Sequence, residues 1–272
     1  MQGLRVVRRL EEPSAGQHLP KHDSHREHVR APIDNDGIKG RKNTNSYLDG
    51  WRALGLDHAE IVAAPAKTRV NRDGSVTLDL VHSARCKASP KAVVLRHSYT
   101  IGSDGSVRAE NIFTVDKAVP DLPRLGVVMT LPSGFEKLKY FGRGPEENYS
   151  DRKAGAMVDL YAGTVTDEYI PYVMPQEHGH HTDVRWLTLA KGDGLGLRVE
   201  SHGTLEFSAS HFTTQDLYAA HHTYDLKPRA ETFLNLDLRQ RGLGTASCGP
   251  DTLEQFKIRP GQYEWSYTLR PV

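Results

Sequence analysis

The stretch SDGSVRAENIFTV, residues 103–115, indicates the fold class more directly than any other part of the chain. It begins with an Asp-Gly pair, and glycine accepts the positive φ of a tight hairpin turn at no steric cost. The residues after the turn alternate, so that Val107, Ala109, Phe113 and Val115 fall on one face of an extended chain. This combination predicts a β-hairpin strand with one buried face and one solvated face.

The same pattern recurs along the chain. RDGS (72–75) is a second Asp-Gly turn, and GDGLGLR (192–198) is expected to be a hairpin turn between strands. Period-two alternation is expected to bury one face of each of three further strands. The expected inward residues are Val76, Leu78 and Leu80, then Leu205, Phe207 and Ala209, and finally Tyr263, Trp265, Tyr267 and Leu269.

Helical patterns are few and short. They cover residues 46–55 and 213–222, with Thr213 or Thr214 as a candidate N-cap of the second helix. We therefore predict an all-β fold, a large antiparallel β sandwich with two short helices, forming a single domain over residues 29–272. Residues 1–28 are polar and show no period of 2 or 3.6, which predicts a poorly ordered lead-in.

Composition excludes several classes of protein. The 272 residues carry a net charge of +1, which gives no basic footprint for nucleic acid. No run approaches the roughly 20 apolar residues that span a membrane, and LRVVRRL at the start is too short for a secretory signal. Cys86 and Cys248 offer neither zinc-site spacing nor a disulfide framework. We expect a cytoplasmic protein.

The stretch YFGRGPEENYSDR (140–152) contains two adjacent carboxylates, Glu146 and Glu147. Adjacent side chains of an extended segment point to opposite sides, whereas a retaining glycosidase needs two carboxylates about 5 Å apart across one substrate. A turn that fixes the scaffold is therefore favoured over a catalytic loop. The residues expected to build this turn are Gly144, Pro145, Glu147, Asn148, Tyr149 and Asp151.

Histidines cluster in QEHGHHTD (176–183) and AAHHTYD (219–225). Imidazole and carboxylate groups are ordinary zinc ligands, but the paired histidines of known helical zinc motifs are absent from these stretches. Gly179 suggests that the first cluster is a flexible surface loop. We therefore predict no metal site in this chain.

The glycine-rich stretch RGLGTASCGPD (241–251) follows a predicted strand, 233–240, and precedes another at 253–258. Such a loop at the end of a sandwich can present a side chain to a ligand, and here that side chain is Cys248. On spacing alone, a connecting loop with a buried thiol is the favoured interpretation.

Four stretches together resemble one family. RAPIDNDG (30–37), residues 140–152, YIPYVMPQEHGHHTDVRWL (169–187) and LNLDLRQRGLGTASCGPD (234–251) are similar, in order and spacing, to the C-terminal domain of family 2 β-galactosidases. That domain also occurs as a separate small subunit. The resemblance covers residues 29–272 and implies a sandwich of the galactose-mutarotase type.

The resemblance also implies where the chemistry lies. The catalytic glutamates and the Mg²⁺ ligands of the family belong to a barrel domain outside this chain, so we expect no catalytic residue and no cofactor here. Mg²⁺, with Na⁺ as a second candidate ion, is implied for the assembled enzyme. Cys248 falls at a pocket-rim position where many relatives carry tryptophan, and a mobile segment is expected to begin at Gly37 and continue through residues 38–45. The 144–151 turn is expected to position a strand exit near subunit contacts.

The implied function is that of a β-galactosidase component, which completes the pocket for terminal β-D-galactosides such as lactose and is inactive alone. The expected partner is a large catalytic subunit, with a homo-oligomer as the alternative. The polar residues 1–28 stand where relatives have strands, so we expect open sheet edges that a partner covers. A free-standing carbohydrate-binding or aldose-epimerase-like protein, with Glu177, His178 or His221 in acid and base roles, is the second hypothesis. Independent galactosidase activity through Glu146, Glu147 or Glu177 is the least favoured.

Overall fold

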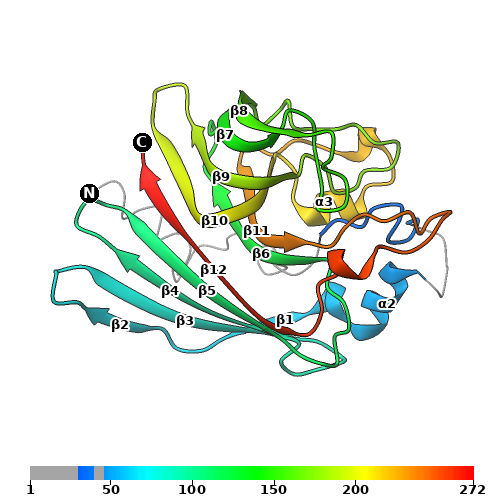
Figure 1. Cartoon of the computed structure of the whole chain (residues 1–272), viewed down its shortest axis with the longest axis horizontal. Helices are drawn as coiled ribbons and strands as arrows, with labels where there is room; N and C mark the ends of the chain where they lie inside the picture. The colour runs from blue at the N-terminus through cyan, green and yellow to red at the C-terminus, as the bar shows by residue number, and fades with distance from the viewer. Residues whose placement is uncertain (1–29, 40–45) are drawn as a thin grey trace.

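The computed structural model describes residues 30–39 and 46–272, and this part of the chain is an antiparallel β protein (Figure 1). Its strands are β1 (Glu60–Ala63), β2 (Lys67–Val70), β3 (Val76–Arg85), β4 (Val93–Ile101), β5 (Val107–Val115), β6 (Arg124–Leu131), β7 (Lys137–Gly144), β8 (Met157–Thr164), β9 (His181–Ala190), β10 (Gly196–Ser210), β11 (Thr232–Gln240) and β12 (Gly261–Pro271). Two short α-helices, α2 (Tyr47–Leu54) and α3 (Thr214–Ala219), accompany them, with 3₁₀ turns at Leu56–His58, Thr223–Asp225 and Glu254–Phe256.

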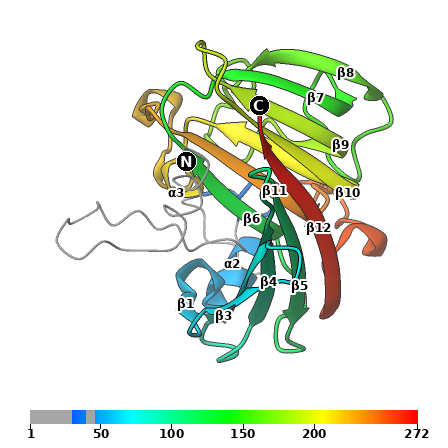
Figure 2. The ribbon, with the colours of Figure 1, turned by 90° about the vertical axis from the view of Figure 1, so that its left-hand side faces the viewer.

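The strands form one hydrogen-bonded network in the order β1-β3-β4-β5-β12-β10-β9-β7-β8, with β2 on β3. The long strand β10 joins its parts, because Leu197–Ser201 pair with β12 whereas Glu206–Ser210 pair with β11, which in turn pairs with β6. Figure 2 shows β7 to β10 above, β3 to β5 and β12 below, and β6 with β11 between them. One large cluster of buried side chains draws on most of these strands, and β8 adds only the partly buried Tyr161. The predicted antiparallel sandwich with two short helices is confirmed.

The predicted hairpin turns are confirmed too, and their chemistry is visible. In the β4–β5 turn, the Asp104 carboxylate accepts hydrogen bonds from the backbone N–H (2.9 Å) and hydroxyl (2.6 Å) of Ser106, and Gly105 has a φ of 79°. The β2–β3 turn repeats this arrangement. The alternation in β5 buries all four predicted residues, and Asn111 is buried with them.

The inward pattern predicted for β3 is wrong. Val76, Leu78 and Leu80 are only half-buried, and the buried residues of the strand are Thr77 and Ala84. Thr77 is satisfied by the Asn71 side-chain amide (2.8 Å) and the Thr100 hydroxyl (3.1 Å). These side chains are only half-buried because of where β3 lies in the sheet. On one edge it pairs only with the four-residue strands β1 and β2, so little of the core covers it.

Both helices begin at the predicted residues. The Ser46 side chain caps α2 by accepting from the N–H of Asp49, and Gly55 ends the helix in the left-handed conformation. Thr213 and Asp216 form a capping box at the start of α3, but this helix stops at Ala219, before the predicted end at residue 222.

The strand predicted at residues 253–258 is absent; this segment contains a 3₁₀ turn and one isolated bridge, Leu122 to Ile258. Backbone groups of this segment form hydrogen bonds with loops and not with a neighbouring strand. The carbonyl of Phe256 accepts from the N–H of Gly242, and the N–H of Ile258 donates to the Asp121 carboxylate. Residues 1–28, predicted to be a lead-in, lie outside the described residues, as do residues 40–45, so the domain boundaries stay predictions. Among the described helices, none is long and apolar enough to cross a membrane.

Candidate functional site

The four family-like stretches meet at one end of the molecule, where the segment 30–39 lies between the 169–180 loop, α3 and the 241–252 loop (Figure 1). We call the exposed part of this region the candidate face and define it by Asp34, Asn35, Ser247 and Cys248. The buried residues beneath it hold these loops in place.

Arg30 anchors the first stretch. Its fully buried guanidinium binds the Asp36 carboxylate through two nitrogens, at 2.8 and 3.1 Å, and donates to the Arg241 carbonyl at 2.7 Å. A paired guanidinium and carboxylate of this kind fix orientation as well as distance. The start of the stretch is therefore fastened to the end of β11.

Asn35 connects the first stretch to the Cys248 loop. Its side-chain amide donates to the Gly244 carbonyl (2.8 Å), and its side-chain oxygen accepts from the hydroxyl (2.6 Å) and N–H (3.3 Å) of Ser247. Cys248 itself is exposed, so the favoured interpretation of a buried thiol is wrong. The two segments that were predicted to contribute to a sugar pocket are thus held together by one side chain.

The 140–152 turn supports the same loop from the other side. The Asp151 carboxylate accepts from the N–H groups of Leu243 (2.9 Å) and Gly244 (2.8 Å), and Arg152 donates to the Gly244 carbonyl at 2.5 Å. A side chain at Gly242 would place its Cβ 2.7 Å from the Asp151 carboxyl carbon. Glycine is therefore required for this close approach.

Glu147 is fully used as an acceptor. It accepts from the N–H of Gly179 (2.8 Å) and from the hydroxyls of Tyr149 (3.1 Å) and Tyr172. Burial, together with the hydrogen bond to Glu147, raises the pKa of Tyr172. A carboxylate that ties three groups of the 149–179 region together is suited to holding a loop.

Asn148 completes the turn. Its side-chain oxygen accepts from the N–H (3.0 Å) and hydroxyl (2.6 Å) of Thr182, while its amide donates to the carbonyls of Arg143 and Glu146. The Gly144–Pro145 peptide bond is cis. These contacts agree with a structural turn; its predicted place near subunit contacts stays a prediction.

The predicted surface loop of histidines is wrong. His178, His180 and His181 are all buried. His181 lies 2.7 Å from Glu168 and His180 lies 3.1 Å from Glu206, so these two rings each have a carboxylate partner, whereas Nδ1 of His178 lies 3.0 Å from the Gln176 carbonyl. Gly179 serves a turn, with a φ of 64°, and not a mobile loop. In residues 30–39 and 46–272, no three histidine, cysteine or acidic side chains are grouped as a metal site.

A buried ion network underlies the first and third stretches. Arg124 binds Asp237 through two nitrogens, at 2.7 and 2.9 Å, and lies 3.5 Å from Glu177. Glu177 accepts from the Gln240 amide at 3.0 Å and from the backbone N–H of Ala31 at 3.3 Å. Burial by itself raises the pKa of Glu177, but Arg124 and neighbouring cations outweigh it, so the pKa is lowered and the group is a carboxylate.

Gly37 does not share the exposure of Cys248. It is half-buried with a φ of 147°, and an added Cβ would lie 2.8 Å from the Cβ of Ser46. The neighbouring Asp36 carbonyl accepts from the N–H of Leu48 at 2.8 Å. The predicted mobile segment after Gly37 falls largely on residues 40–45, outside the described residues.

Lys39 is a residue that the sequence did not single out. Its buried ammonium donates to the carbonyls of Pro175, Leu217 and Ala220, the last at 3.0 Å. Burial lowers its pKa to about 8, against a smaller opposing effect of Asp34. Lys39 thereby joins the first stretch to the third stretch and to the C-terminal end of α3.

Tyr47 was missed as well. The Arg241 guanidinium lies 3.9 Å from the centre of the Tyr47 ring and also binds Asp121 (2.5 Å) and Asp251 (2.9 Å). Burial and then a hydrogen bond to Asp251 raise the pKa of Tyr47 to about 12. Tyr47, the first residue of α2, therefore contacts the Cys248 loop at the C-terminal end of that loop.

The three glutamates considered as independent catalysts do not form a pair on the candidate face. Glu147 and Glu177 are bound as described above, and Glu146 is exposed on the turn. The epimerase hypothesis needs an acid and a base that face the same sugar. Glu177 and His178 are buried whereas His221 is exposed, so these residues do not share one accessible surface. What the arrangement offers is a rigidly supported rim of polar and backbone groups.

Comparison with known proteins places the chain. It is 34% identical over 243 residues to a β-galactosidase of Staphylococcus xylosus, covering 89% of this chain and 23% of that protein. It is 32% identical over 246 residues to a β-galactosidase of Vibrio cholerae, again covering 89% and 23%. The chain thus spans under a quarter of these curated relatives.

Solved structures with a similar trace include a GalM/aldose epimerase homologue from C. elegans (TM-score 0.42, 12% identity, covering 90% of this chain and 80% of that one). Another is a galactose 1-epimerase from Lactobacillus acidophilus (TM-score 0.38, 9% identity, covering 80% and 68%). The family model described as the β-galactosidase small chain matches residues 10–269. The chain belongs to the β-galactosidase small-chain family.

Proposed function

We propose that this chain is the part of a β-galactosidase that completes the galactose pocket, while the catalytic glutamates lie on a barrel domain or chain outside it. The reaction is the hydrolysis of terminal non-reducing β-D-galactosides such as lactose. The proposal is supported by membership of the small-chain family and by relatives named β-galactosidase, of which this chain covers under a quarter.

The observation that carries the proposal is the Asn35 link. It holds residues 34–36 and the Cys248 loop side by side, and Asp34, Ser247 and Cys248 are exposed at the candidate face. The exposed polar side chains of Asp34, Ser247 and Cys248 are available there for sugar hydroxyls, and Asn35 holds them in place. The family resemblance implies that Cys248 stands where many relatives have tryptophan, so we propose that this rim acts by shape and hydrogen bonding and not by aromatic stacking.

In a retaining hydrolase, one carboxylate attacks the anomeric carbon and a second protonates the leaving oxygen and then activates water. This chain's share is to orient the sugar and exclude bulk water, which can lower a barrier by several kcal/mol without any reacting group. We assign the implied Mg²⁺ and Na⁺ to the catalytic part, and no step performed by this chain's residues depends on them.

The partner that we propose is a large catalytic β-galactosidase chain, with self-association as the alternative, and the proposed location is the cytoplasm. Strand β8 is a candidate contact, because among the described strands it pairs only with β7. Its exposed residues include Met157, Val158 and Leu160. An open apolar strand edge of this kind favours association with another chain.

The test is to assay the purified chain with a chromogenic β-galactoside, alone and mixed with a large family partner. Activity that requires the mixture supports the proposal. In the mixture, Asn35→Ala is expected to raise KM and lower kcat/KM by roughly tenfold, because small misplacements of positioning groups are costly. Glu146→Gln is the matched control and should leave both constants unchanged. Activity of the chain alone that one Glu→Gln change abolishes would overturn the proposal.

A further inference from the structure

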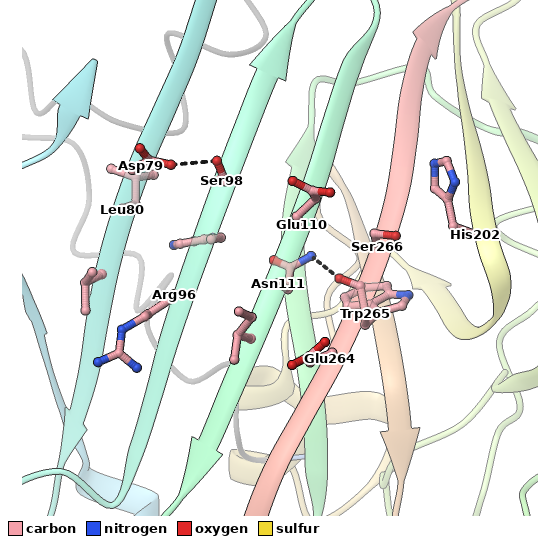
Figure 3. A pocket seen from close by; sticks show the side chains of 13 residues that line it. Asp79, Leu80, Arg96, Ser98, Glu110, Asn111, His202, Glu264, Trp265 and Ser266 are labelled. Carbon is pink, nitrogen blue, oxygen red and sulfur yellow. Dashed lines mark hydrogen bonds between the residues drawn. The ribbon is translucent and has the colours of Figure 1, made fainter. Parts of the chain in front are cut away.

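A groove of about 680 Å³ crosses strands β3, β4, β5 and β12, with His202 of β10 at its margin (Figure 3). It shares no lining residue with the candidate face. The volume lies within the range of about 300–1,000 Å³ that is usual for small-molecule sites. The groove therefore has room for a monosaccharide or disaccharide.

Strand register explains which side chains the groove presents. Two rows run across the four strands on the side opposite the core, since His97, Asn111 and Trp265, which lie between the two rows, are buried. Neighbouring strands are about 4.8 Å apart, so the residues of a row are close neighbours. One row is Asp79, Ser98, Glu110 and Ser266, and the other is Val81, Arg96, Ile112 and Glu264.

The groove is polar but electrically balanced. Its three carboxylates are Asp79, Glu110 and Glu264. The Arg69 guanidinium lies 2.8 Å from the Asp79 carboxylate, and the Arg108 guanidinium lies 3.2 Å from the Glu110 carboxylate. A third cation, Arg96, lines the groove directly. A site with this balance gives little net attraction to a free cation or to a phosphate, because either would disturb existing pairs.

The lining offers donors and acceptors together on an apolar floor. Carboxylate oxygens accept, Arg96 donates, and the hydroxyls of Ser98 and Ser266 do either. The Ser98 hydroxyl is already oriented by a 2.6 Å bond to Asp79, which leaves its oxygen to accept. Val81 and Ile112 supply apolar surface between these polar groups. A saccharide matches this set, because each hydroxyl both donates and accepts while the ring's C–H groups are apolar.

We propose that this groove is a binding site for a neutral saccharide, with Glu110 and Ser98 as its central hydrogen-bonding groups and Ile112 under the sugar ring. The proposal does not depend on the proposed function, because it concerns the chain by itself. The two are separable by experiment, since a galactoside that binds only at the candidate face would leave the groove's signals unchanged.

The experiment is a titration of the purified, ¹⁵N-labelled chain with methyl β-D-galactoside and with lactose, followed by amide chemical shifts. We expect saturable shifts in the backbone amides of residues 79–81, 96–98, 110–112 and 264–266. Glu110→Gln and Ser98→Ala should each weaken binding, the first by about tenfold, since hydrogen bonds to charged groups are stronger than those between neutral groups.

Glu60→Gln is the matched control, because Glu60 is another exposed strand carboxylate with an arginine partner, Arg85 at 3.4 Å. It should bind as the wild type does. Unchanged amide spectra away from the groove establish that each variant is folded. Shifts that are absent at high millimolar sugar, or that persist equally in both groove variants, overturn the proposal. Binding of an arginine-rich peptide in place of sugar also overturns it and identifies an acidic docking surface.

Discussion

The candidate face and the groove both rely on charged side chains, but they hold them in opposite environments. Beneath the face, Arg30 and Arg124 are fully buried and each grips a carboxylate through two nitrogens. In the groove, the pairs Arg69–Asp79 and Arg108–Glu110 stand in solvent, with Arg69 60% exposed. Buried pairs fix geometry and are costly to break, whereas exposed pairs contribute little stability and leave their groups available. The face is therefore built for rigidity and the groove for access.

The largest expected effect comes from breaking the buried network. Arg124→Met leaves Asp237 and Glu177 buried without their main cation, and we expect the free energy of unfolding to fall by about 3–5 kcal/mol. Urea unfolding at pH 7 measures it. Arg69→Met in the exposed pair is the counterpart and should cost about 1 kcal/mol or less. Equal losses at the two sites would remove the contrast between the regions.

Glu147→Ala should have the next largest effect. It deprives the N–H of Gly179 and the hydroxyls of Tyr149 and Tyr172 of their acceptor, so we expect a loss of about 2 kcal/mol. Thermal unfolding of the purified chain is a sufficient measurement. Glu146→Ala, one residue away and exposed, should stay within about 0.5 kcal/mol of the wild type. If Glu147→Ala changes neither folding nor assembly with a partner chain, the structural role of this turn is refuted.

Lys39, beneath the face, gives the stability of the chain a pH dependence in the alkaline range. Its folded pKa is about 8, below the 10.5 of a free lysine, so between these values the unfolded chain binds more protons. Stability from this group therefore rises with pH across that window, by at most about 1.4 kcal/mol per pH unit, and is constant below it.

The check is urea unfolding from pH 7 to 10 for the wild type and Lys39→Met, because the difference between the two cancels other alkaline titrations. The wild type should gain stability relative to Lys39→Met as the pH rises above 8. Lys117→Met, at an exposed lysine, should follow the wild-type curve. A difference that stays flat with pH would show that the ammonium of Lys39 titrates normally.

The smallest expected effect on stability is that of Asn35→Ala, about 1 kcal/mol, because the side chain is only half-buried. Its local effect should be larger: hydrogen exchange at residues 244–248 should accelerate. Asn71→Ala removes two side-chain hydrogen bonds in the β2–β3 turn and should leave that exchange unchanged. Unaltered exchange in Asn35→Ala would mean that Asp151 alone holds the loop.

Local signals in the sequence were enough to predict several of the strands, the Asp-Gly turns and the starts of both helices. In these features the deciding contacts lie within a few residues, such as Asp104 with Ser106 or Ser46 with Asp49. The inward face of β3 could not be predicted, because it depends on how little of the core covers that strand. Alternation identifies two faces but does not say how deeply either is buried.

The candidate site was predictable only as a set of stretches. Their convergence depends on contacts between residues far apart in the chain, such as Arg124 with Asp237 and Asn35 with Gly244. The histidine cluster was misjudged for the same reason, since Glu206 comes from a different strand. Lys39 carries no local signal at all, because its partners are backbone carbonyls and any residue type supplies these.

The Asn35 link has a consequence for the order of events during synthesis. Asn35 and Gly244 are 209 positions apart, and Arg30 and the Arg241 carbonyl are 211 apart. A nascent chain cannot form these contacts until residues 241–247 have left the ribosome. Residues 30–35 therefore lack their native partners during most of translation. The hairpins of the first half can form while translation continues, whereas the candidate face can be assembled only late in synthesis.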